Sequence, residues 1–512
     1  MAFISPGAYW RELDFSEYAP SLASTRYGVL GGATWGPEDE PTVITNENDM
    51  TLQFGKPVAS DYGLHSGLHY LRRGNQLMYC RVGNNAQKAD AIVLENGSSA
   101  TNMTITAKYS GSRGNNIQVT IANGTTAGKY KVTVVMPLDD EGLVTDTETF
   151  YDLDYTTTSK YFMEDAVNDG VYAEMNKSRY IEIDVEDGAT APTLGTYTLG
   201  QSPNTAGTDG ITGLTSADYI GLYTGQSATG LKAFANAEIL DVNLLAVPGV
   251  TDASVLFELL STCETRADAM AIIDPRWGLN TNEVVTWHND PAETGGNSLN
   301  SSYGALYWPW IQAYDAYTQK DMWFPPNGFV AAQMAYNDYI AAPWFAPAGL
   351  NRGAIRSGLK LEMSPDSGQR DTLYGFPNSI NPIVNFNAYG ITIWGNQTLQ
   401  RKTSALRDIN VRRGLLYFEK IVATSVLYLV FDPNDPVTQK RFTNLVSPVA
   451  EDIKKRRGFY DFRVICDEST NPDIAIDRKE MYGKVLIKPT RAAEKIVVDF
   501  AVLASGAEFA EY

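Results

Sequence analysis

Histidine is scarce in this chain, whose 512 residues include only His65, His69 and His288. A hydrolase that acts through serine or cysteine needs a histidine base beside its nucleophile. None of the three lies near a nucleophile signature, and the G-x-S-x-G elbow is missing. His65 and His69 are spaced like metal ligands on an expected helix, but no H-E-x-x-H motif is formed. We therefore predict no catalytic residue and no metal ligand, and expect both histidines on a helix surface.

Cysteine and long apolar segments are scarce too. The three cysteines, Cys80, Cys263 and Cys466, are scattered and suggest neither a disulfide framework nor a metal knuckle, which favours a reducing compartment. The most apolar segment, 422–431, is too short to span a bilayer. The first residues have no basic n-region and no apolar h-region, so they do not form a signal peptide. We expect assembly in a cytoplasm, without membrane insertion.

Loops that bind phosphate or calcium are also missing. The segment GTTAGK at 124–129 departs from the spacing G-x-x-x-x-G-K-[ST]. It separates two alternating segments, so it is better explained as a hairpin turn. The acidic residues at 139–141 lack the alternating ligands of an EF-hand and indicate a solvated turn. No cofactor is predicted.

Positive charge is in short supply, since the net charge is −19. A strongly acidic chain argues against coating nucleic acid, which needs a positive surface. Residues 401–500 are the exception, with 19 Lys and Arg against 14 Asp and Glu. They include the one basic run, Lys454, Lys455, Arg456 and Arg457. A protein contact or a helix cap explains that run better than DNA does, so we expect this region to face something acidic.

What the chain does contain is 29 tyrosines, 9 tryptophans and 43 glycines. Amphipathic rings suit large contact surfaces, but composition alone favours the other interpretation, a β-rich protein with half-exposed strands. From residue 91 to about 207 the chain is rich in Thr, Asn and Gly with period-two runs, which predicts an inserted β-barrel or β-sandwich. The strand–helix–strand spacing on either side of it predicts a parallel sheet with right-handed crossovers. The expected helices are 61–74, 229–237, 252–266, 409–427 and 436–457, and the expected strands are 77–82, 243–249, 269–274, 463–466, 484–488 and 495–503.

Several longer segments resemble one known family, the contractile phage tail sheath proteins of the myovirus type. The resemblance begins with SPGAYWRELD near the amino terminus and YLRRGNQLMYCRVG at 70–83. It continues in the family's order over nearly the whole chain. The later segments are ALYWPWIQAYD (305–315), FPPNGFVAAQMAYNDYIAAPWFAPAG (324–349), YGITIWGNQTL (389–399), DINVRRGLLYFEKIV (408–422), FDPND (431–435), FRVICDESTN (462–471) and KVLIKPTRAAEKIVVDF (484–500).

The resemblance implies a structural role and no enzyme activity. The chain would polymerise helically around a tail tube and contract, without nucleotide hydrolysis, to drive the tube through the host envelope for genome delivery. Its partners would be further copies in stacked hexameric rings, the tail tube protein, baseplate proteins and tail terminator or neck proteins, with no direct contact to nucleic acid. It would be part of the virion, assembled in the bacterial host cytoplasm. A sheath of a contractile bacteriocin or extracellular injection system is the alternative, and a subtilisin-like hydrolase is the alternative from another class.

The resemblance also implies a division of the chain. The α/β core would have subtilisin-like topology without the triad. The expected parts are an amino-terminal arm (1–22), a core segment (23–90), an outer β-domain (91–207), the rest of the core (208–384), a tube-facing α+β domain (385–490) and a carboxyl-terminal arm (491–512). The arms would exchange strands between subunits through Ile4, Tyr9, Ile496, Val498, Phe500 and Val502. Lys454, Lys455, Arg456 and Arg457 would contact the tube.

Overall fold

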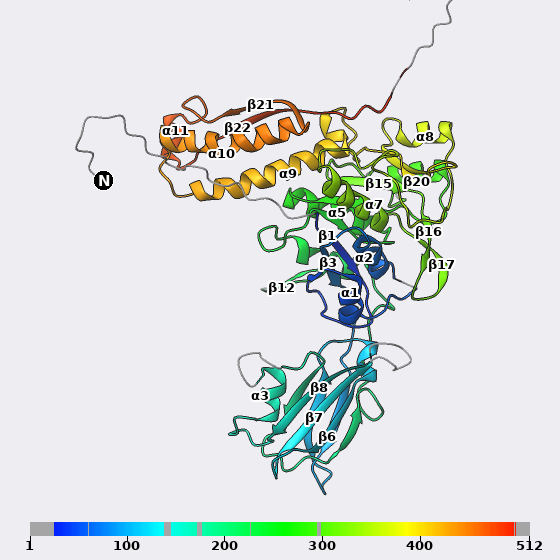
Figure 1. The fold of residues 1–512 in the computed structure, drawn as a ribbon, viewed down its shortest axis with the longest axis vertical. Helices are drawn as coiled ribbons and strands as arrows, with labels where there is room; N and C mark the ends of the chain where they lie inside the picture. The colour runs from blue at the N-terminus through cyan, green and yellow to red at the C-terminus, as the bar shows by residue number, and fades with distance from the viewer. Residues whose placement is uncertain are drawn as a thin grey trace, which may run out of the picture.

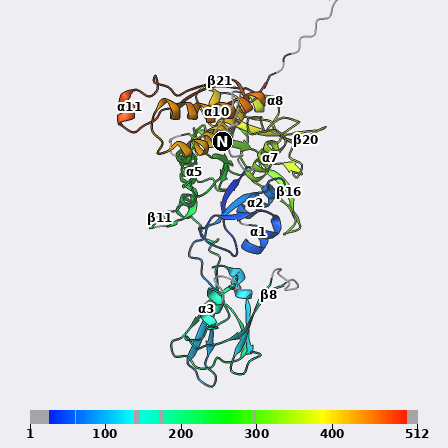
Figure 2. The same ribbon diagram turned by 60° about the vertical axis from the view of Figure 1, so that its left-hand side comes forward.

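The computed structural model describes residues 25–59, 61–137, 145–170, 177–225, 227–293, 298–495 and 497. They form an elongated molecule with an antiparallel β-domain at one end, an α/β core in the middle and a helical hairpin at the other end (Figure 1). Figure 2 shows that the β-domain meets the core through a narrow neck. The predicted class, mixed α/β with several sheets, is confirmed. The six residues assigned to the arms lie outside the described residues.

An eight-stranded sheet organises the core. Its strand order is β2-β3-β1-β13-β14-β15-β19-β20, and every pair from β3 to β19 is parallel, while β2 and β20 run antiparallel at the edges. The strands are β1 (Tyr27–Gly31), β2 (Thr42–Ile44), β3 (Leu77–Arg81), β13 (Leu244–Ala246), β14 (Met270–Ile273), β15 (Gly304–Trp308), β19 (Ile380–Phe386) and β20 (Gly390–Ile393).

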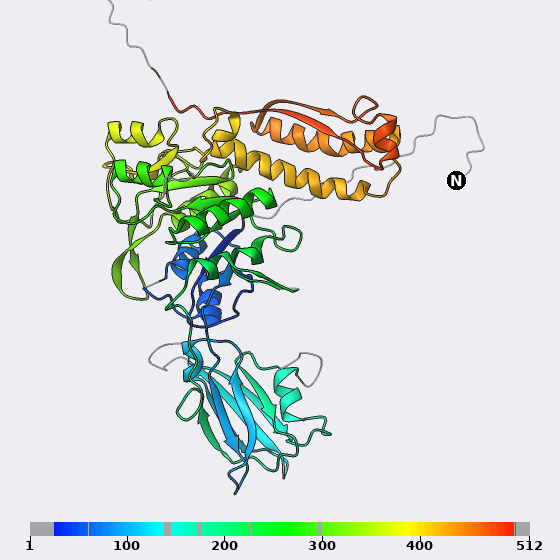
Figure 3. The same ribbon diagram turned by 180° about the vertical axis from the view of Figure 1, so that it is seen from behind.

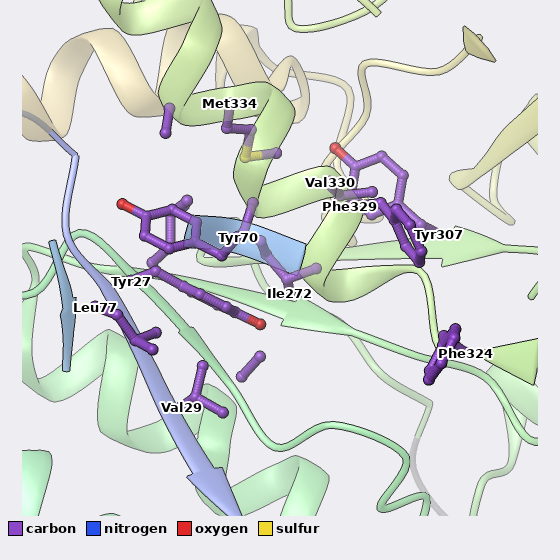
Figure 4. Close-up of a cluster of buried hydrophobic side chains, with 14 of the residues drawn as sticks. Tyr27, Val29, Tyr70, Leu77, Ile272, Tyr307, Phe324, Phe329, Val330 and Met334 are labelled. Carbon is purple, nitrogen blue, oxygen red and sulfur yellow. The ribbon is translucent and has the colours of Figure 1, made fainter. Parts of the chain in front are cut away.

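The central strands are buried on both faces, as parallel strands normally are. Alternate residues enter two separate hydrophobic clusters, so Val29 belongs to one face and Leu30 to the other. In Figure 4, Tyr27, Tyr70 and Met334 of the first cluster gather between the sheet and the helices that cover it. The core helices are α1 (Glu47–Phe54), α2 (Gly63–Leu71), α4 (Ser216–Ile220), α5 (Ala253–Arg266), α6 (Thr281–Asn289), α7 (Asn327–Ile340), α8 (Ser367–Tyr374) and the 3-10 helix η2 (Gly230–Phe234).

The expected helix at 229–237 is wrong. Only five residues are helical there, as the 3-10 helix η2. Gly230 has a φ of +55°, outside the helical region, and the side chain of Asn236 accepts the N–H of Glu238. Such local side-chain hydrogen bonds compete with helix formation. Two small sheets complete the core: a hairpin of β11 (Tyr223–Thr224) and β12 (Ser227–Ala228), and β17 (Lys320–Phe324), β16 (Ile311–Asp315) and β18 (Lys360–Leu361) in that order.

The outer β-domain consists of two antiparallel sheets around their own hydrophobic cluster. The segment GTTAGK is a hairpin turn, as predicted, since it joins β6 to β7 and the N–H of Gly124 donates to the carbonyl of Lys129. One sheet has the order β4-β5-β9 and the other β10-β6-β7-β8. The elements are β4 (Asp90–Leu94), β5 (Thr101–Ala107), η1 (Ser112–Asn116), β6 (Gln118–Asn123), β7 (Tyr130–Pro137), β8 (Thr145–Leu153), α3 (Met163–Asn168), β9 (Ile181–Val185) and β10 (Gly195–Thr198).

The C-terminal domain is a helical hairpin backed by a two-stranded sheet, with a fourth hydrophobic cluster between them. Seen from behind, the hairpin projects sideways beyond the core sheet (Figure 3). The elements are η3 (Ala405–Arg407), α9 (Ile409–Val426), η4 (Leu427–Leu429), α10 (Pro436–Lys455), β21 (Phe459–Ile465), α11 (Asp473–Asp477) and β22 (Lys484–Pro489). No helix in the described ranges is long and apolar enough to cross a membrane.

Arg81, the last residue of β3, ties the outer domain to the core. Its side chain is fully buried, and it donates to the carbonyls of Gly36 (2.7 Å), Ser110 (2.6 Å) and Asp209 (3.0 Å). Asp209 lies on the segment that returns from the outer domain to the core, and Ser110 lies in the loop of the outer domain between β5 and η1. A single guanidinium therefore holds a loop of the outer domain and the returning connection against the loop that follows β1, and it satisfies three carbonyl acceptors in doing so.

We expect Arg81→Met to loosen this attachment. Three carbonyls would lose their donor, and a buried polar group left without its partner costs about 1–3 kcal/mol. The melting temperature should fall by several degrees, and limited proteolysis should cut near residues 109–111 and 207–210. The control is Arg276→Met, because Arg276 pairs with Glu293 at 2.6 Å in an exposed position and should cost less than about 1 kcal/mol. An unchanged protease pattern for Arg81→Met would show that the clamp does not hold the neck.

Candidate assembly surfaces

The three histidines lie in the interior of the protein. His65 and His69 are buried at 2% and 6% exposure, and His288 is fully buried, so the expected surface position of the first two is wrong. Both lie where α2 packs on the core; the ring of His69 stacks on Phe329 with centroids 4.1 Å apart. Burial lowers the pKa of all three, to about 4 for His288, so they are neutral near pH 7. In the described part of the chain no group of three His, Cys, Asp or Glu side chains is arranged to hold a metal ion.

A network of buried polar side chains extends from Tyr27, the first residue of β1, to Asp274, which directly follows β14 at the carboxyl end of the sheet, where α/β enzymes usually place their active sites. The hydroxyl of Tyr27 donates to Ser66 Oγ (3.0 Å), which donates to Asn327 Oδ1 (2.8 Å). The backbone and side-chain N–H groups of Asn327 donate to Asp274 at 3.0 and 2.6 Å. Burial raises the pKa of Asp274 to about 8, despite the donors from Asn327 and Gly249. These hydrogen bonds connect strands β1 and β14 to helices α2 and α7 and so stabilise the core. The sequence analysis did not predict this network, because its residues are far apart in the sequence.

The joint between core and C-terminal domain is also polar and buried. Arg413 of α9 forms two hydrogen bonds with Asp338 of α7, at 3.1 and 2.6 Å. The neighbouring Arg412 lies over the ring of Tyr303, 3.6 Å from its centroid. Lys420, two turns further on, pairs with Asp241 and Asp268 of the core. Planar, bidentate pairing of this kind fixes orientation as well as proximity, so α9 is firmly attached to the sheet.

The small sheet of the C-terminal domain has open edges. β21 and β22 pair only with each other among the described residues, with Phe462 opposite Ile487 and Val464 opposite Val485. β22 alternates exposed and half-buried residues, as expected for a strand with one face on the helices. Unpaired strand edges present rows of backbone donors and acceptors, which readily accept another strand.

An apolar tip lies at the far end of the hairpin, where α9 turns into α10. We define it as Leu427, Tyr428, Val430, Phe431 and Val437, which are 54–102% exposed. Phe431 is the most exposed, and its φ of +76° is rare for a residue with a side chain. Exposed apolar clusters of this size usually mark contacts with other proteins. The motif FDPND contains part of the tip, but nothing in the sequence pattern alone showed that its phenylalanine faces solvent.

The basic run has internal partners for two of its four members. Lys454 pairs with Asp461 at 3.0 Å. Arg456 lies over the ring of Trp344, 5.0 Å from its centroid, and the indole N–H of Trp344 donates to the Arg456 carbonyl. Lys455 and Arg457 are exposed and form no ion pair within the described residues. The run therefore caps α10 against the core, and the tube contact of Lys454, Lys455, Arg456 and Arg457 stays a prediction.

Comparison with known proteins gives consistent matches. A family model described as "Phage tail sheath protein central domain" matches residues 202–399, and one described as "Phage tail sheath C-terminal domain" matches residues 401–502. The tail sheath protein of Vibrio phage KVP40 is 30% identical over 303 residues, which cover 55% of this chain and 45% of that protein. The tail sheath protein of Enterobacteria phage T4 is 28% identical, covering 54% and 44%. The chain thus spans less than half the length of these relatives.

Solved structures share the fold. The crystal structure of a sheath tail protein from Listeria innocua superposes with a TM-score of 0.61 at 14% identity, covering 92% of this chain and 96% of the other. The contracted sheath complex of an extracellular contractile injection system, PVC, gives a TM-score of 0.55 at 16% identity and covers 98% of both chains.

We expect stability to fall as pH rises, through Asp274. Its folded pKa of about 8 lies above the ordinary value of 3.8, so the folded state holds a proton that the unfolded state releases. This contribution is complete below pH 4 and is lost as pH rises toward 8, by at most about 1.4 kcal/mol per pH unit. Calorimetric melting from pH 5 to 8.5 should show a flatter profile for Asp274→Asn than for the wild type. The exposed control Asp184→Asn should follow the wild type; a parallel profile for Asp274→Asn would contradict the assignment.

Proposed function

Because the chain belongs to the contractile phage tail sheath protein family, we propose that it is a sheath subunit that polymerises helically around a tail tube and shortens to drive the tube through a host envelope, delivering a genome. The observation that carries the proposal is the consecutive match of both sheath domains over residues 202–399 and 401–502. A sheath of a bacteriocin or extracellular injection system is the alternative within this class, favoured by the fold shared with the PVC sheath.

A helical polymer needs head-to-tail contacts between successive copies that do not close the whole assembly into a point group. The open edges of the β21–β22 sheet support strand exchange, in which an arm of one copy adds a strand to the sheet of the next. In this proposal Ile4 and Tyr9 belong to one such arm, and Ile496, Val498, Phe500 and Val502 to the other. The copies form stacked hexameric rings, and the polymer ends on baseplate and terminator proteins. The particle is a virion tail, assembled in the host cytoplasm.

The outer domain, the α/β core and the C-terminal domain are separate parts of the molecule, which supports a different role for each in the sheath. The C-terminal domain (385–490) faces the tube, the core (23–90 and 208–384) carries most lattice contacts, and the outer domain (91–207) points away from the tube. The rigid joint between Arg413 and Asp338 suits subunits that rotate as nearly rigid bodies during contraction. The energy comes from surface buried between copies of a metastable lattice and requires no nucleotide hydrolysis.

The core supports a subtilisin-like topology without a triad, because its parallel sheet is covered by helices on both faces. The hydrolase alternative needs a histidine that can accept a proton from a nucleophile. All three histidines are buried, and Asp274 at the usual catalytic edge is engaged by Asn327. These contacts support a structural role for the groups that a hydrolase would use.

The first test is negative-stain electron microscopy of the purified chain over a concentration series, where we expect long, hollow, striated tubes. Tyr428→Asp combined with Phe431→Asp should raise the concentration needed for tubes at least tenfold, because the apolar tip is buried on assembly. The monomer should melt as the wild type does, since both side chains are exposed. Tyr151→Asp, an exposed tyrosine of the outer domain, is the matched control. Monomers at every concentration, even with tube protein present, would refute the sheath proposal.

A second test concerns the tube contact. Lys455→Glu combined with Arg457→Glu reverses two exposed charges and spares the contacts of Lys454 and Arg456. We expect unchanged self-assembly, but weaker co-sedimentation with tube protein at about 0.15 M salt, where charges within about 8 Å still interact. Lys320→Glu combined with Lys360→Glu, two exposed lysines of the core, is the control with the same change in charge. Equal tube binding by both variants would remove the basic run from the tube interface.

A further inference from the structure

A small cavity of about 240 Å³ lies on the core, between the end of α2, the middle of α7 and the loop that precedes β18. Three arginines contribute to its lining, which is exceptional in a chain with a net charge of −19. The lining residues used below are His69, Arg72, Arg73, Gln333 and Arg356.

Arg73 is held in place at this cavity. One of its terminal N–H groups donates to Gln333 Oε1 at 2.6 Å, and its guanidinium lies over the ring of Tyr336, 4.6 Å from the centroid. Gln333 is 97% buried and is itself fixed, because its amide donates to the carbonyl of Arg352. An arginine that is already ordered loses little side-chain entropy when it binds, which favours recognition.

The positive charge at the cavity is not neutralised. Neither Arg73 nor Arg356 has a carboxylate within 4.0 Å in the described ranges, and Arg72 has only Glu47 at 3.9 Å. Burial and the neighbouring charge of Arg356 both lower the pKa of Arg73, as expected for guanidinium groups that face each other without an anion. A cleft with one sign of charge concentrates ligands of the opposite sign.

His69 adds a polar group to the same lining. It is 94% buried, and its Nδ1 has no hydrogen-bond partner. Burial is the main cause that lowers its pKa, with Arg72 and His65 contributing, so the ring is neutral. A buried polar atom without a partner costs free energy, and with its proton on Nδ1 the neutral ring can donate to an oxyanion.

We propose that this cavity binds an aspartate or glutamate side chain from a second copy of the chain, an inference that rests on the sheath function proposed above. Guanidinium groups pair with carboxylates in a planar, bidentate geometry, and the volume accommodates the end of one side chain rather than a polymer. Each copy carries 60 Asp and Glu residues, so a homopolymer presents carboxylates to every cavity. The net charge of −19 disfavours nucleic-acid phosphates as the ligand.

The test uses three variants of the full chain and measures the lowest protein concentration that gives tubes. Arg356→Glu should raise this concentration about tenfold; Arg356 is exposed, so the monomer should keep its melting temperature. Lys131→Glu, on the outer domain, carries the same change in charge and should leave the concentration unchanged. Arg356→Lys keeps the charge and supplies an amine that a carbodiimide can couple to a carboxylate within contact distance. Mixed polymers of ¹⁴N- and ¹⁵N-labelled chains then identify cross-links between copies by mass spectrometry.

A cross-link between position 356 of one copy and an acidic residue of another, together with the loss of assembly in Arg356→Glu, supports the proposal. If Arg356→Glu forms tubes at the same concentration as the wild type, or if the cross-link lies within one chain, the carboxylate proposal is wrong and the proposed sheath function is unaffected. Inorganic phosphate that binds the monomer at this cavity in calorimetry, with no cross-link between copies, assigns the cavity to a free oxyanion and also overturns it. A wild type that forms no tubes overturns both proposals.

Discussion

The whole molecule depends on burying both faces of one parallel sheet. Strands such as β1 and β14 have no solvent-facing side, so helices must cover them above and below. The two hydrophobic clusters on those faces contain most of the large buried side chains of the core. Everything added to the core therefore has to enter through loops at the ends or edges of strands. The outer domain does so after β3, and the helical hairpin follows the edge strand β20.

Buried polar contacts then determine how the domains are oriented on the core, which hydrophobic burial alone does not specify. Arg81 holds the neck of the outer domain, Arg413 holds the hairpin, and Asn327 connects Asp274 to Ser66 inside the core. Each of these side chains is buried and engages partners far away in sequence. Apolar packing tolerates many arrangements of similar volume, whereas a buried donor fits only where an acceptor lies. The fixed arrangement of the outer domain, the core and the C-terminal domain thus depends on a small number of charged and amide groups.

The sequence predicted the elements with strong periodicity well. Helix α5 and helix α9 lie almost where the pattern placed them, and the alternating run before residue 207 forms antiparallel sheets. The segment 280–350 resisted interpretation, because β15 is buried on both faces and α7 is apolar on most of its surface, so neither shows a clear period. The burial of His65 and His69 was missed for the same reason: α2 is enclosed on nearly all sides. The arginine-lined cavity and the apolar tip depend on residues that meet only in the folded chain.

The neck of the outer domain has a mechanical consequence. Gln87 and Thr208 exchange two backbone hydrogen bonds, so the chain leaves the core and returns to it at the same place. Tension between the first core strand and the C-terminal hairpin is therefore carried by the central sheet and bypasses residues 88–207. The outer domain is a side branch off this path, so its sheets can change in sequence or thickness without altering the stiffness of the α/β core.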